Sequence, residues 1–505
     1  MYGLSSGRRL ALEESARLLR LDNPGSRGEG LNGKRGYADM RLGDAQRQKN
    51  QEQLALPGMG RGEASIHAGR GTEASTAAHE PDNPASTERM MEEICHPENL
   101  KKALRRVIQN RGKPGIDGMT VERLTEHLRS HWPEIRESLL QGTYRPEPIR
   151  RVEIPKPGGG VRLLGIPTVQ DRFIQQAVLQ VLQPRWDGTF SDSSYGFRPG
   201  RGSHMAVRRA QGYIEQGCPY VVDIDLEKFF DRVNHDQLMA LVSNRVSDKR
   251  LLKLLRAFLN AGVMTNGLIG PPQDEGVPQG GPLSPLLSNL VLDRLDHELN
   301  RRGLRHVRYA DDCNIYVRSE RAGHRVMRSI SHFITRTLKL RVNRAKSAVA
   351  HPWERKFLGF SFSRAGGRVK RRLSPETIRR LKARVRELTR AAKGQSFQRT
   401  IDRLSEYLRG WNAYFRYCQT PNTFRNLNAW IRRRLRCAIW RQWKNSRQRW
   451  RKLIAMNIPE EIAHRSARSL HGPWKTSTFQ GISMALSIAY FKQVGLPTLS
   501  ILESA

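Results

Sequence analysis

Three aspartates occupy positions where the folded chain could gather them. Asp225 lies near the end of the apolar stretch 220–226, and Asp311 and Asp312 stand side by side between two stretches that favour β structure. Aspartate is a poor strand former, so aspartates next to stretches that favour β structure indicate a functional or structural requirement. An antiparallel sheet would bring the end of the first stretch beside the tip of a hairpin at 309–312. Three carboxylates meeting there would repel one another unless cations held them.

Such a cluster is suited to phosphoryl transfer. Two Mg²⁺ ions roughly 3.5–4 Å apart, with Mn²⁺ as a substitute, would activate an attacking 3′-hydroxyl and stabilise the transferred phosphoryl group. The four residues 309–312 are too short a pattern to establish this. The alternative is an acidic turn beside an unrelated aspartate at a strand end. Asp223 and Asp231 flank Asp225 and could be ion-pair partners for the many arginines.

The composition favours a polyanionic partner. The 505 residues include 87 Lys and Arg against 48 Asp and Glu, which gives a net charge of +39. The sequence has no run of about 20 apolar residues, and its first residues lack the pattern of a secretory signal. We therefore expect a nucleic acid partner and no membrane. None of the five cysteines forms a C-x-x-C pair, so we expect no zinc and a reducing, cytoplasmic location in a bacterium.

Hydrophobic periodicity predicts the elements that would position these acids. A helix should start near Pro97, with Leu100, Leu104 and Val107 on its apolar face. The other expected elements are strands at 151–156 and 161–166, a helix around 177–182, a strand at 220–226, helices within 236–261, a loop at 276–282, an apolar helix at 283–299 and a strand at 357–362.

The two ends of the chain differ from its middle. Residues 1–88 are rich in Gly, Ser, Ala and charge, which is typical of a flexible extension. Residues 368–392 form a strongly basic stretch with helical periodicity. No acidic residue lies between Glu406 and Glu460, where tryptophans and arginines alternate. We expect the tryptophans mainly in the core of a helical bundle and the arginines on nucleic acid phosphates.

Several stretches resemble the motifs of one family. Residues 225–236 resemble its first palm motif, in which the first Asp of D-x-x-x-x-F-D is the metal ligand and selects Asp225. Further similar stretches are 309–312, 278–289 behind the incoming nucleotide, 154–160 with 164–167 in the fingers, 194–201, 342–347, 357–360 and the N-terminal motif 114–118. These motifs follow one another along about residues 90–505 in the order expected for the family, and the chain resembles a group II intron-encoded reverse transcriptase/maturase, closest to the bacterial class C type.

The resemblance implies an α+β fold, a right-hand polymerase followed by helices. The implied parts are a flexible extension at 1–88, fingers and a palm with an antiparallel sheet at 89–366, a helical thumb or maturase domain at 367–445 and a small DNA-binding region at 446–505. No cysteine follows Cys437, so we expect no zinc-supported H-N-H endonuclease domain. Priming would then use other available 3′ ends, such as nascent strands.

The resemblance also assigns roles to single residues. Asp225, Asp311 and Asp312 would be the catalytic metal ligands, together with the backbone of Leu226. The nucleotide would contact Lys156, Arg162, Phe230, Gln279, Gly280 and Lys346. Nucleic acid contacts would come from Arg198, Arg432, Arg433, Arg434, Arg436 and Arg441.

Most of these roles have a simpler alternative. Lys156 and Arg162 could grip template phosphates instead of the triphosphate. Phe230, expected as a gate against a ribose 2′-hydroxyl, could be an ordinary core aromatic. The stretch 279–280 could be a plain turn. Lys346, expected to protonate the departing pyrophosphate, could be a surface lysine.

The resulting hypothesis is an RNA-directed DNA polymerase that binds its group II intron RNA, assists splicing and copies the intron during retrohoming. Its partners would be that RNA, an RNA template with a DNA primer, target DNA and dNTPs. A splicing factor with a dead polymerase is disfavoured, because all three aspartates are present. A polymerase recruited by the host for DNA repair or defence remains as an alternative.

Overall fold

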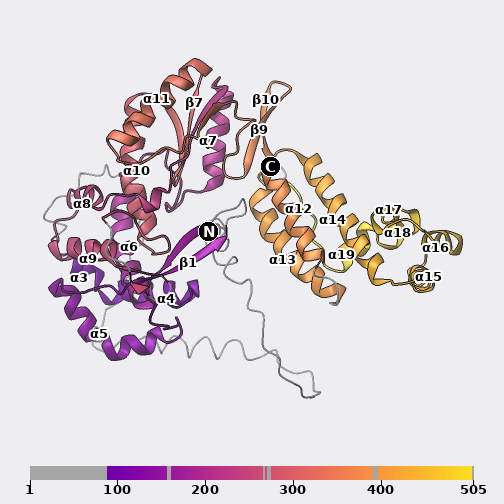
Figure 1. Ribbon diagram of the computed structural model, residues 1–505, viewed down its shortest axis with the longest axis horizontal. Helices are drawn as coiled ribbons and strands as arrows, with labels where there is room; N and C mark the ends of the chain where they lie inside the picture. Colours follow the sequence, from indigo (N-terminus) through magenta and orange to yellow (C-terminus); the bar gives the residue numbers. More distant parts are fainter. Residues whose placement is uncertain (1–87, 156–160, 266–267, 270–273, 391–395, 503–505) are drawn as a thin grey trace, which may run out of the picture.

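The computed structural model describes residues 88–155, 161–265, 268–269, 274–390 and 396–502. The predicted extension therefore lies outside the described residues, except for its last position. Figure 1 shows two groups of elements, fingers and palm on one side and a set of helices on the other, joined through the hairpin β9–β10.

One group of elements, drawn from residues 90–187 and 249–269, is called the fingers here after the part that the resemblance implies. The predicted helix from Pro97 is α4, and its face with Leu100, Ala103, Leu104 and Val107 is buried as expected. The helices here are α3 (Met90–Ile94), α4 (Pro97–Asn110), α5 (Leu124–Gln141), α6 (Val169–Asp187) and α9 (Lys249–Asn260). They surround a sheet of order β2-β1-β4-β5, with β1 (Ile149–Pro155), β2 (Val161–Ile166), β4 (Val263–Thr265) and β5 (Leu268–Ile269).

The palm is built on a four-stranded antiparallel sheet of order β6-β7-β3-β8. Its strands are β3 (Tyr220–Ile224), β6 (Arg305–Tyr309), β7 (Asp312–Val317) and β8 (Ala348–Ala350). The accompanying helices are α7 (Ser203–Glu215), the short 3₁₀ helix η2 (Phe229–Asp231), α8 (His235–Ser243), α10 (Ser284–Arg301) and α11 (Glu320–Arg336). The antiparallel palm sheet predicted by the resemblance is therefore present.

Both faces of the palm sheet are buried, but in different hydrophobic cores. Val222 and Ile224 of β3 belong to the core shared with the fingers. Val221 of β3 and Tyr316 of β7 belong to the core shared with α7 and the C-terminal helices. This split follows the alternation of side chains along a strand, and it explains why apolar residues stand at both odd and even positions of the stretch 220–226, which also contains Asp223 and Asp225.

One sequence prediction fails at the start of the C-terminal part. Residues 368–373 were expected to be helical, but they form β10 (Arg368–Leu373), which pairs with β9 (Phe360–Ala365). Gly366 and Gly367 both have positive φ and make the turn that joins the two strands. The basic helix begins afterwards, as α12. The predicted boundary at 366/367 thus falls inside a hairpin.

The C-terminal helices share one core with the palm. This core contains Leu381, Leu435, Leu453 and Phe491 together with Phe360 of β9. The helices are α12 (Pro375–Arg390), α13 (Phe397–Phe415), α14 (Pro421–Gln442), α15 (Ser446–Ile454), α16 (Glu460–Ala467), α17 (Pro473–Thr476), α18 (Gln480–Ala485) and α19 (Ile488–Gln493). Trp411, Trp440 and Trp443 are buried in it, as predicted, while Trp430 and Trp450 are half-buried.

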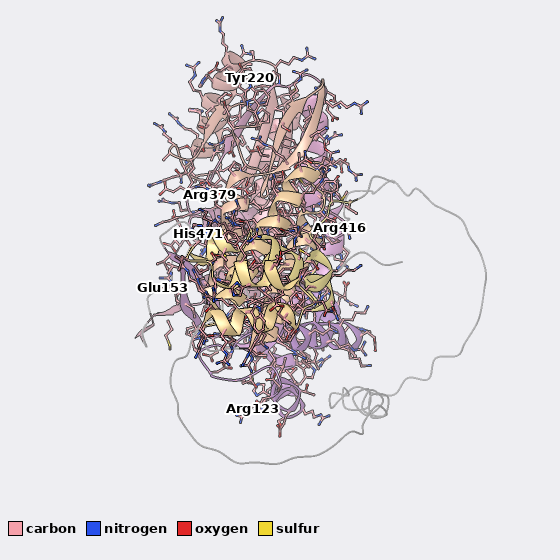
Figure 2. All side chains as sticks on the ribbon, turned by 90° about the vertical axis from the view of Figure 1, so that its right-hand side faces the viewer. Arg123, Glu153, Tyr220, Arg379, Arg416 and His471 are labelled. Atoms are coloured by element: carbon pink, nitrogen blue, oxygen red, sulfur yellow. The ribbon has the colours of Figure 1, made fainter. Side chains whose placement is uncertain are left out.

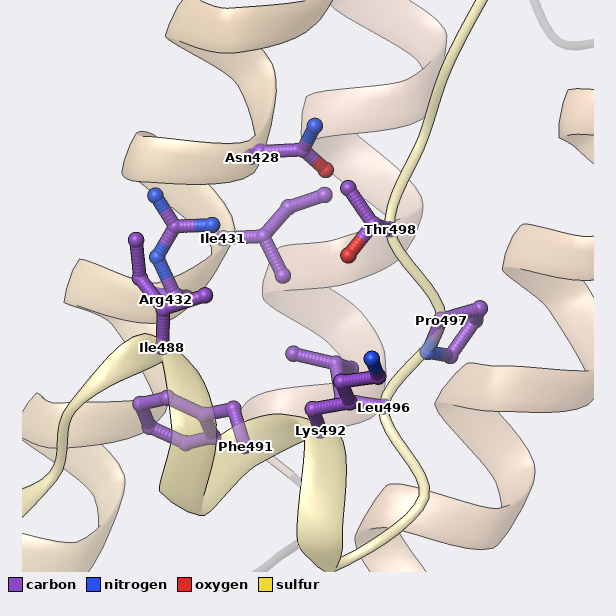
Figure 3. A pocket seen from close by; sticks show the side chains of 9 residues that line it. All are labelled: Asn428, Ile431, Arg432, Ile488, Phe491, Lys492, Leu496, Pro497 and Thr498. Atoms are coloured by element: carbon purple, nitrogen blue, oxygen red, sulfur yellow. The ribbon is translucent and has the colours of Figure 1, made fainter.

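The last segment of the chain is tied to α14. Asn428 donates from Nδ2 to the Leu499 carbonyl at 2.8 Å, and its Oδ1 accepts from the Leu499 N–H at 2.9 Å. A small pocket lies beside this link, with Arg432 and Lys492 among its lining residues (Figure 3). Because buried side chains of α15, α16, α18 and α19 belong to the same core as those of α14, the described residues 446–502 have no separate hydrophobic core. Among the described residues, no helix is long and apolar enough to cross a membrane.

Candidate functional site

The palm sheet places Asp225 and Asp312 beside each other. Ile224 of β3 pairs with Cys313 of β7 in antiparallel register, and one step further along each strand lie Asp225 and Asp312. Residues opposed in this way have Cβ atoms about 4.5–5.5 Å apart and point to the same face. That face is the one on which Val221 and Tyr316 meet the second core. Two of the three predicted carboxylates are therefore brought together by strand register.

Asp311 lies in the turn next to them. Tyr309 pairs with Asp312, so Ala310 and Asp311 are the two turn residues. Ala310 has φ +55°, as the first residue of a primed two-residue turn requires. For a residue with a side chain, this conformation is sparsely populated and needs support from the surroundings. Part of the support is Gly196, because a Cβ there would lie 2.3 Å from the Ala310 amide nitrogen.

The carboxylates influence one another electrostatically. Crowding by protein atoms, followed by the charges of Asp311, Asp223 and Asp225, raises the pKa of Asp312 to about 7. The Asp312 residue is still solvent-exposed, so its carboxylate is only partly desolvated. The three like charges therefore contribute substantially to its raised pKa. Asp223 has its own partner, because Arg355 donates from Nε and Nη2 to its Oδ2 at 2.9 and 2.6 Å. The prediction that Asp223 is an ion-pair partner and not a metal ligand is consistent with this contact.

Hydrogen bonds from the segment 342–347 hold the backbone that follows β3. Asn343 donates its N–H to the Asp225 carbonyl at 2.8 Å, and the Asp225 N–H donates to Ser347 Oγ at 3.0 Å. Leu226 forms an isolated antiparallel bridge with Val342. The loop that provides these contacts also carries Lys346, whose Nζ lies 3.8 Å from Asp225 Oδ1. The Lys346 side chain is 66% exposed, so it can move away from this position.

The acids suit a hard divalent cation, although they are not gathered into a finished ligand set. Carboxylate oxygens are the ligands that Mg²⁺ prefers, and the charges of Asp311, Asp223 and Asp225 add to the effect of burial in raising the pKa of Asp312. Within the described ranges, no group of three His, Cys, Asp or Glu side chains lies close enough to hold a metal ion. A cation would therefore have to draw Asp311 and its neighbours inward.

The titration of Asp312 predicts how stability depends on pH. Because its pKa rises from the usual 3.8 to about 7, the folded protein keeps a proton in this range that the unfolded chain has lost. Raising the pH through this window then lowers the free energy of unfolding. We expect the melting temperature in EDTA to fall between pH 5 and 8 by more in the wild type than in Asp312→Asn. Equal falls in both proteins would contradict this assignment.

Phe230, one of the residues predicted to contact the nucleotide, lies in η2 next to the loop 276–282. Phe229 is 2% exposed and belongs to the core, whereas Phe230 is half-buried. The Phe230 carbonyl accepts from the Val277 N–H at 2.6 Å, so Phe230 sits at the base of the loop 276–282. Phe229 is a core aromatic, and Phe230 packs against the same core with part of its surface exposed, so both interpretations of Phe230 stay predictions.

The same loop is joined to the fingers. Gly165 of β2 donates its N–H to the Gln279 carbonyl at 2.8 Å. Gly280 has φ +133°, and a Cβ there would lie 2.2 Å from the Gly165 carbonyl oxygen. Glycine is therefore required at position 280 by conformation and by space. Lys156 lies outside the described residues, and for Arg162 the structure describes the backbone in β2 but not the side chain.

The prediction that Arg198 contacts nucleic acid is contradicted. Arg198 is 5% exposed, and its guanidinium donates to the Asp187 carboxylate at 2.9 Å and to the Ser191 carbonyl at 2.6 Å. It also donates to the carbonyls of Asp187, Phe190 and Ser194. With its donors used inside the protein, Arg198 holds the segment 187–198 together and has none to offer a phosphate.

Of the five predicted arginines of α14, three bind other parts of the protein, and the other two are Arg432 and Arg441. Arg433 donates to the Trp474 carbonyl at 3.0 Å and lies 4.0 Å from the Trp474 ring centroid, and Arg436 donates to the Leu486 carbonyl at 3.0 Å. Both tie α14 to the helices that follow it. Arg434 is half-buried and donates to Thr389 Oγ1 at 3.2 Å. Arg432 lines the pocket of Figure 3 and is half-buried, and Arg441 is exposed.

Sequence reasoning missed several residues that support the site. Gly196 lies against the turn at Ala310, and Arg355 binds Asp223 of β3. Arg308 is fully buried and directly precedes Tyr309. The available signals were an arginine within a β-favouring stretch and the acids Asp293 and Asp296 within an apolar helix. A charge inside an apolar element indicates a buried partner.

Comparison with known proteins matches two family models. Residues 154–362 match reverse transcriptase (RNA-dependent DNA polymerase), and residues 378–454 match the group II intron maturase-specific domain. The second match begins in α12 and ends in α15, so it extends beyond the predicted limit at 445.

Two curated relatives and one set of structures illustrate the similarity. Protein YkfC of Escherichia coli K12 is 34% identical over 304 residues, which cover 52% of this chain and 80% of YkfC. The group II intron-encoded protein LtrA of Lactococcus lactis is 38% identical over 164 residues, 32% of this chain and 27% of LtrA. A Cas6-RT-Cas1–Cas2 complex aligns at a TM-score of 0.33 with 25% identity, over 52% of this chain and 46% of that chain. A TM-score this low does not establish a shared fold.

The polymerase match covers the palm sheet with Asp225, Asp311 and Asp312, and the maturase match covers the helices packed behind it. Members of such families use divalent metal ions and nucleic acid substrates. The chain belongs to the group II intron reverse transcriptase/maturase family, with a reverse transcriptase domain followed by a maturase-specific domain.

Proposed function

We propose that the protein is an RNA-directed DNA polymerase of class C type that binds its own group II intron RNA, assists its splicing and copies it into DNA at a target site. The observation that carries this proposal is the presence of both domains in one chain, with the aspartates of the first at the end of the palm sheet. Target DNA, primer and dNTPs complete the set of partners.

In this proposal the palm acids are the catalytic centre. Asp225, Asp311, Asp312 and the Leu226 backbone would hold two Mg²⁺ ions, or Mn²⁺ in their place, and these ions would activate the primer 3′-hydroxyl and neutralise the triphosphate. The geometry that supports this is local: Asp225 follows β3 and Asp312 begins β7, next to the paired residues Ile224 and Cys313, and Asp311 lies in the adjoining turn. Lys346, next to Asp225, would donate a proton to the pyrophosphate.

The nucleotide would lie over the loop 276–282. Phe230 lies at the base of this loop and would face the sugar, while Gln279 and Gly280 lie where the loop meets β2. Lys156, together with Arg162 of β2, would bind the triphosphate. The half-buried position of Phe230 suits a residue that packs on one side and contacts a ligand on the other.

The helical part offers a cationic surface for RNA. Figure 2 shows nitrogen-tipped side chains around these helices, with Arg379 and Arg416 labelled, and both residues are exposed. Lys382 Nζ and the Arg386 guanidinium carbon each lie 5.5 Å from the centroid of the half-buried Trp430 ring. Such cations are held in place by the ring and remain available to phosphates.

The test of this function is primer extension joined to a splicing assay. Purified protein, Mg²⁺, dNTPs and a DNA primer on an RNA template should yield full-length cDNA. The intron RNA from the flanking DNA should splice faster with the protein at a Mg²⁺ concentration at which it does not splice unaided. Absence of extension would contradict the polymerase, and extension without any effect on splicing would favour a polymerase recruited by the host.

RNA binding should depend steeply on salt, with different contributions from the α14 arginines. Each phosphate contact releases counterions, so the logarithm of the affinity should fall linearly with the logarithm of the salt concentration. Arg441→Gln should reduce the slope by about 0.7–1 and leave the melting temperature unchanged. Arg436→Gln should lower the melting temperature, because it removes the bonds to Leu486 and Ser483. A shallow wild-type slope would contradict an arginine-based RNA surface.

A further inference from the structure

The turn that carries Asp311 and Asp312 rests on a buried arginine. Arg308 of β6 is 0% exposed, and so is Asp296 of α10. Arg308 Nε donates to both Asp296 carboxylate oxygens at 2.9 Å, and Nη2 donates to Oδ2 at 2.6 Å. A buried ion pair of this kind is often no more stabilising than well-packed apolar residues. The role of the Arg308–Asp296 pair is therefore inferred from the hydrogen bonds that it makes and not from its contribution to stability.

The same guanidinium connects three separate segments. Its Nη1 donates to Asn289 Oδ1 of α10 at 3.0 Å and to the Ala310 carbonyl at 2.9 Å, and its Nη2 donates to Ser194 Oγ at 2.7 Å. Asn289 Nδ2 in turn donates to the Gly196 carbonyl at 2.8 Å. A closed network thus links α10, the segment 193–196 and the turn.

The contact to the Ala310 carbonyl matters most for the site. This oxygen belongs to the peptide group between Ala310 and Asp311, so fixing it fixes the plane from which Asp311 projects. Ala310 also holds a φ of +55°, which a residue with a side chain keeps only when its surroundings enforce it. The strand next to the turn is fastened as well, because Arg308 donates its N–H to the Ser193 carbonyl at 2.8 Å.

We infer that Arg308 is a positioning residue: together with Asp296 and Asn289, it orients the peptide of the turn so that Asp311 and Asp312 present their carboxylates to a divalent cation. This inference rests on the proposed polymerase function and deepens it. A lysine cannot replace the arginine here, because an ammonium group lacks the planar fork that reaches the carboxylate, the amide and the carbonyl together.

The first test compares Arg308→Lys with the wild type in two measurements. One is primer extension per folded molecule as a function of Mg²⁺ concentration. The other is Mn²⁺ binding to the protein, followed by electron paramagnetic resonance of the free ion. We expect Arg308→Lys to lower the extension rate by about 10–100-fold, to raise the half-saturating Mg²⁺ concentration and to weaken Mn²⁺ binding severalfold. Affinity for the RNA–DNA duplex should be unchanged.

Two further variants separate positioning from stability. Asn289→Ala keeps the Arg308–Asp296 ion pair but removes the hydrogen bonds to Arg308 Nη1 and to the Gly196 carbonyl. It should raise the half-saturating Mg²⁺ concentration and weaken Mn²⁺ binding, each by a smaller factor than Arg308→Lys does. Leu104→Ala removes a fully buried side chain of α4 in the fingers. It should lower the melting temperature and leave the half-saturating Mg²⁺ concentration unchanged.

The outcomes distinguish the inference from the function on which it rests. Wild-type metal dependence and extension rate in both Arg308→Lys and Asn289→Ala would overturn the inference, even if both variants melt earlier. If the wild type does not extend primers, the proposed function fails, and the Mn²⁺ binding comparison still decides whether Arg308 positions the acids. If Arg308→Lys does not fold, Asn289→Ala decides.

Discussion

Asp311→Asn will abolish RNA-templated DNA synthesis and leave the protein folded and bound to RNA. The substitution keeps the size of the side chain and removes one negative charge from a site where charges already repel, since Asp311 contributes to the raised pKa of Asp312. Without metal bound, the variant should therefore be at least as stable as the wild type. Loss of a cation ligand removes the charge stabilisation on which phosphoryl transfer depends, so the rate should fall by about 10³-fold or more.

The matched control for Asp311→Asn is Asp236→Asn. Asp236 lies in the first turn of the helix α8, its side chain is 81% exposed, and it pairs with Arg256 at 2.8 Å. Losing an exposed ion pair costs little, so extension should continue at nearly the wild-type rate. Extension by Asp311→Asn at the rate of this control would show that Asp311 does not act in catalysis.

Gly196→Ala will reduce extension by about 100-fold and lower the melting temperature. The added Cβ would lie 2.3 Å from the Ala310 amide nitrogen and 3.1 Å from its Cα. These are backbone atoms of the turn, so the turn must move to make room, and Asp311 moves with it. The loss should appear in the rate at saturating template and nucleotide, because the RNA-binding helices are not affected.

Gly212→Ala is the control for this glycine. Gly212 lies in α7, and a Cβ there would meet nothing within 4 Å. An alanine inside a helix is favoured over glycine by about 0.5–1 kcal/mol, so this variant should be as stable as the wild type or more stable, and fully active. A fully active Gly196→Ala would contradict the close approach of residue 196 to the turn.

The palm was predicted by resemblance, but the single elements that carry its acids were predictable because their signals are local. The stretch 220–226, the acidic pair at 311–312 and the apolar helix at 283–299 each determine an element, and the register of β3 against β7 follows from their apolar patterns. Phe230 and Gln279 were assigned by resemblance, and the structure adds that their loops are joined through Val277. This contact between segments distant in sequence is part of the tertiary structure, and local sequence patterns do not predict it.

The errors arose where long-range contacts override local tendencies. Residues 368–373 have helical periodicity, but pairing with β9 across the turn at Gly366 makes them a strand. Arg198 has the residue type of a phosphate contact, but the carbonyls and the carboxylate around it fill its donors. The DNA-binding region at 446–505 was assigned by resemblance and stays a prediction; the structure adds that apolar side chains of residues 446–502 lie in a core shared with the palm.

The most direct test of the metal site is cleavage of the backbone by bound Fe²⁺. With ascorbate and peroxide, Fe²⁺ in place of Mg²⁺ generates hydroxyl radicals that cut the chain near its ligands. We predict cuts near residues 225 and 310–312 that excess Mg²⁺ suppresses and that Asp225→Asn and Asp311→Asn weaken. Cuts confined to other parts of the chain, or unchanged in both variants, would contradict the assignment of these aspartates as the metal ligands of the polymerase.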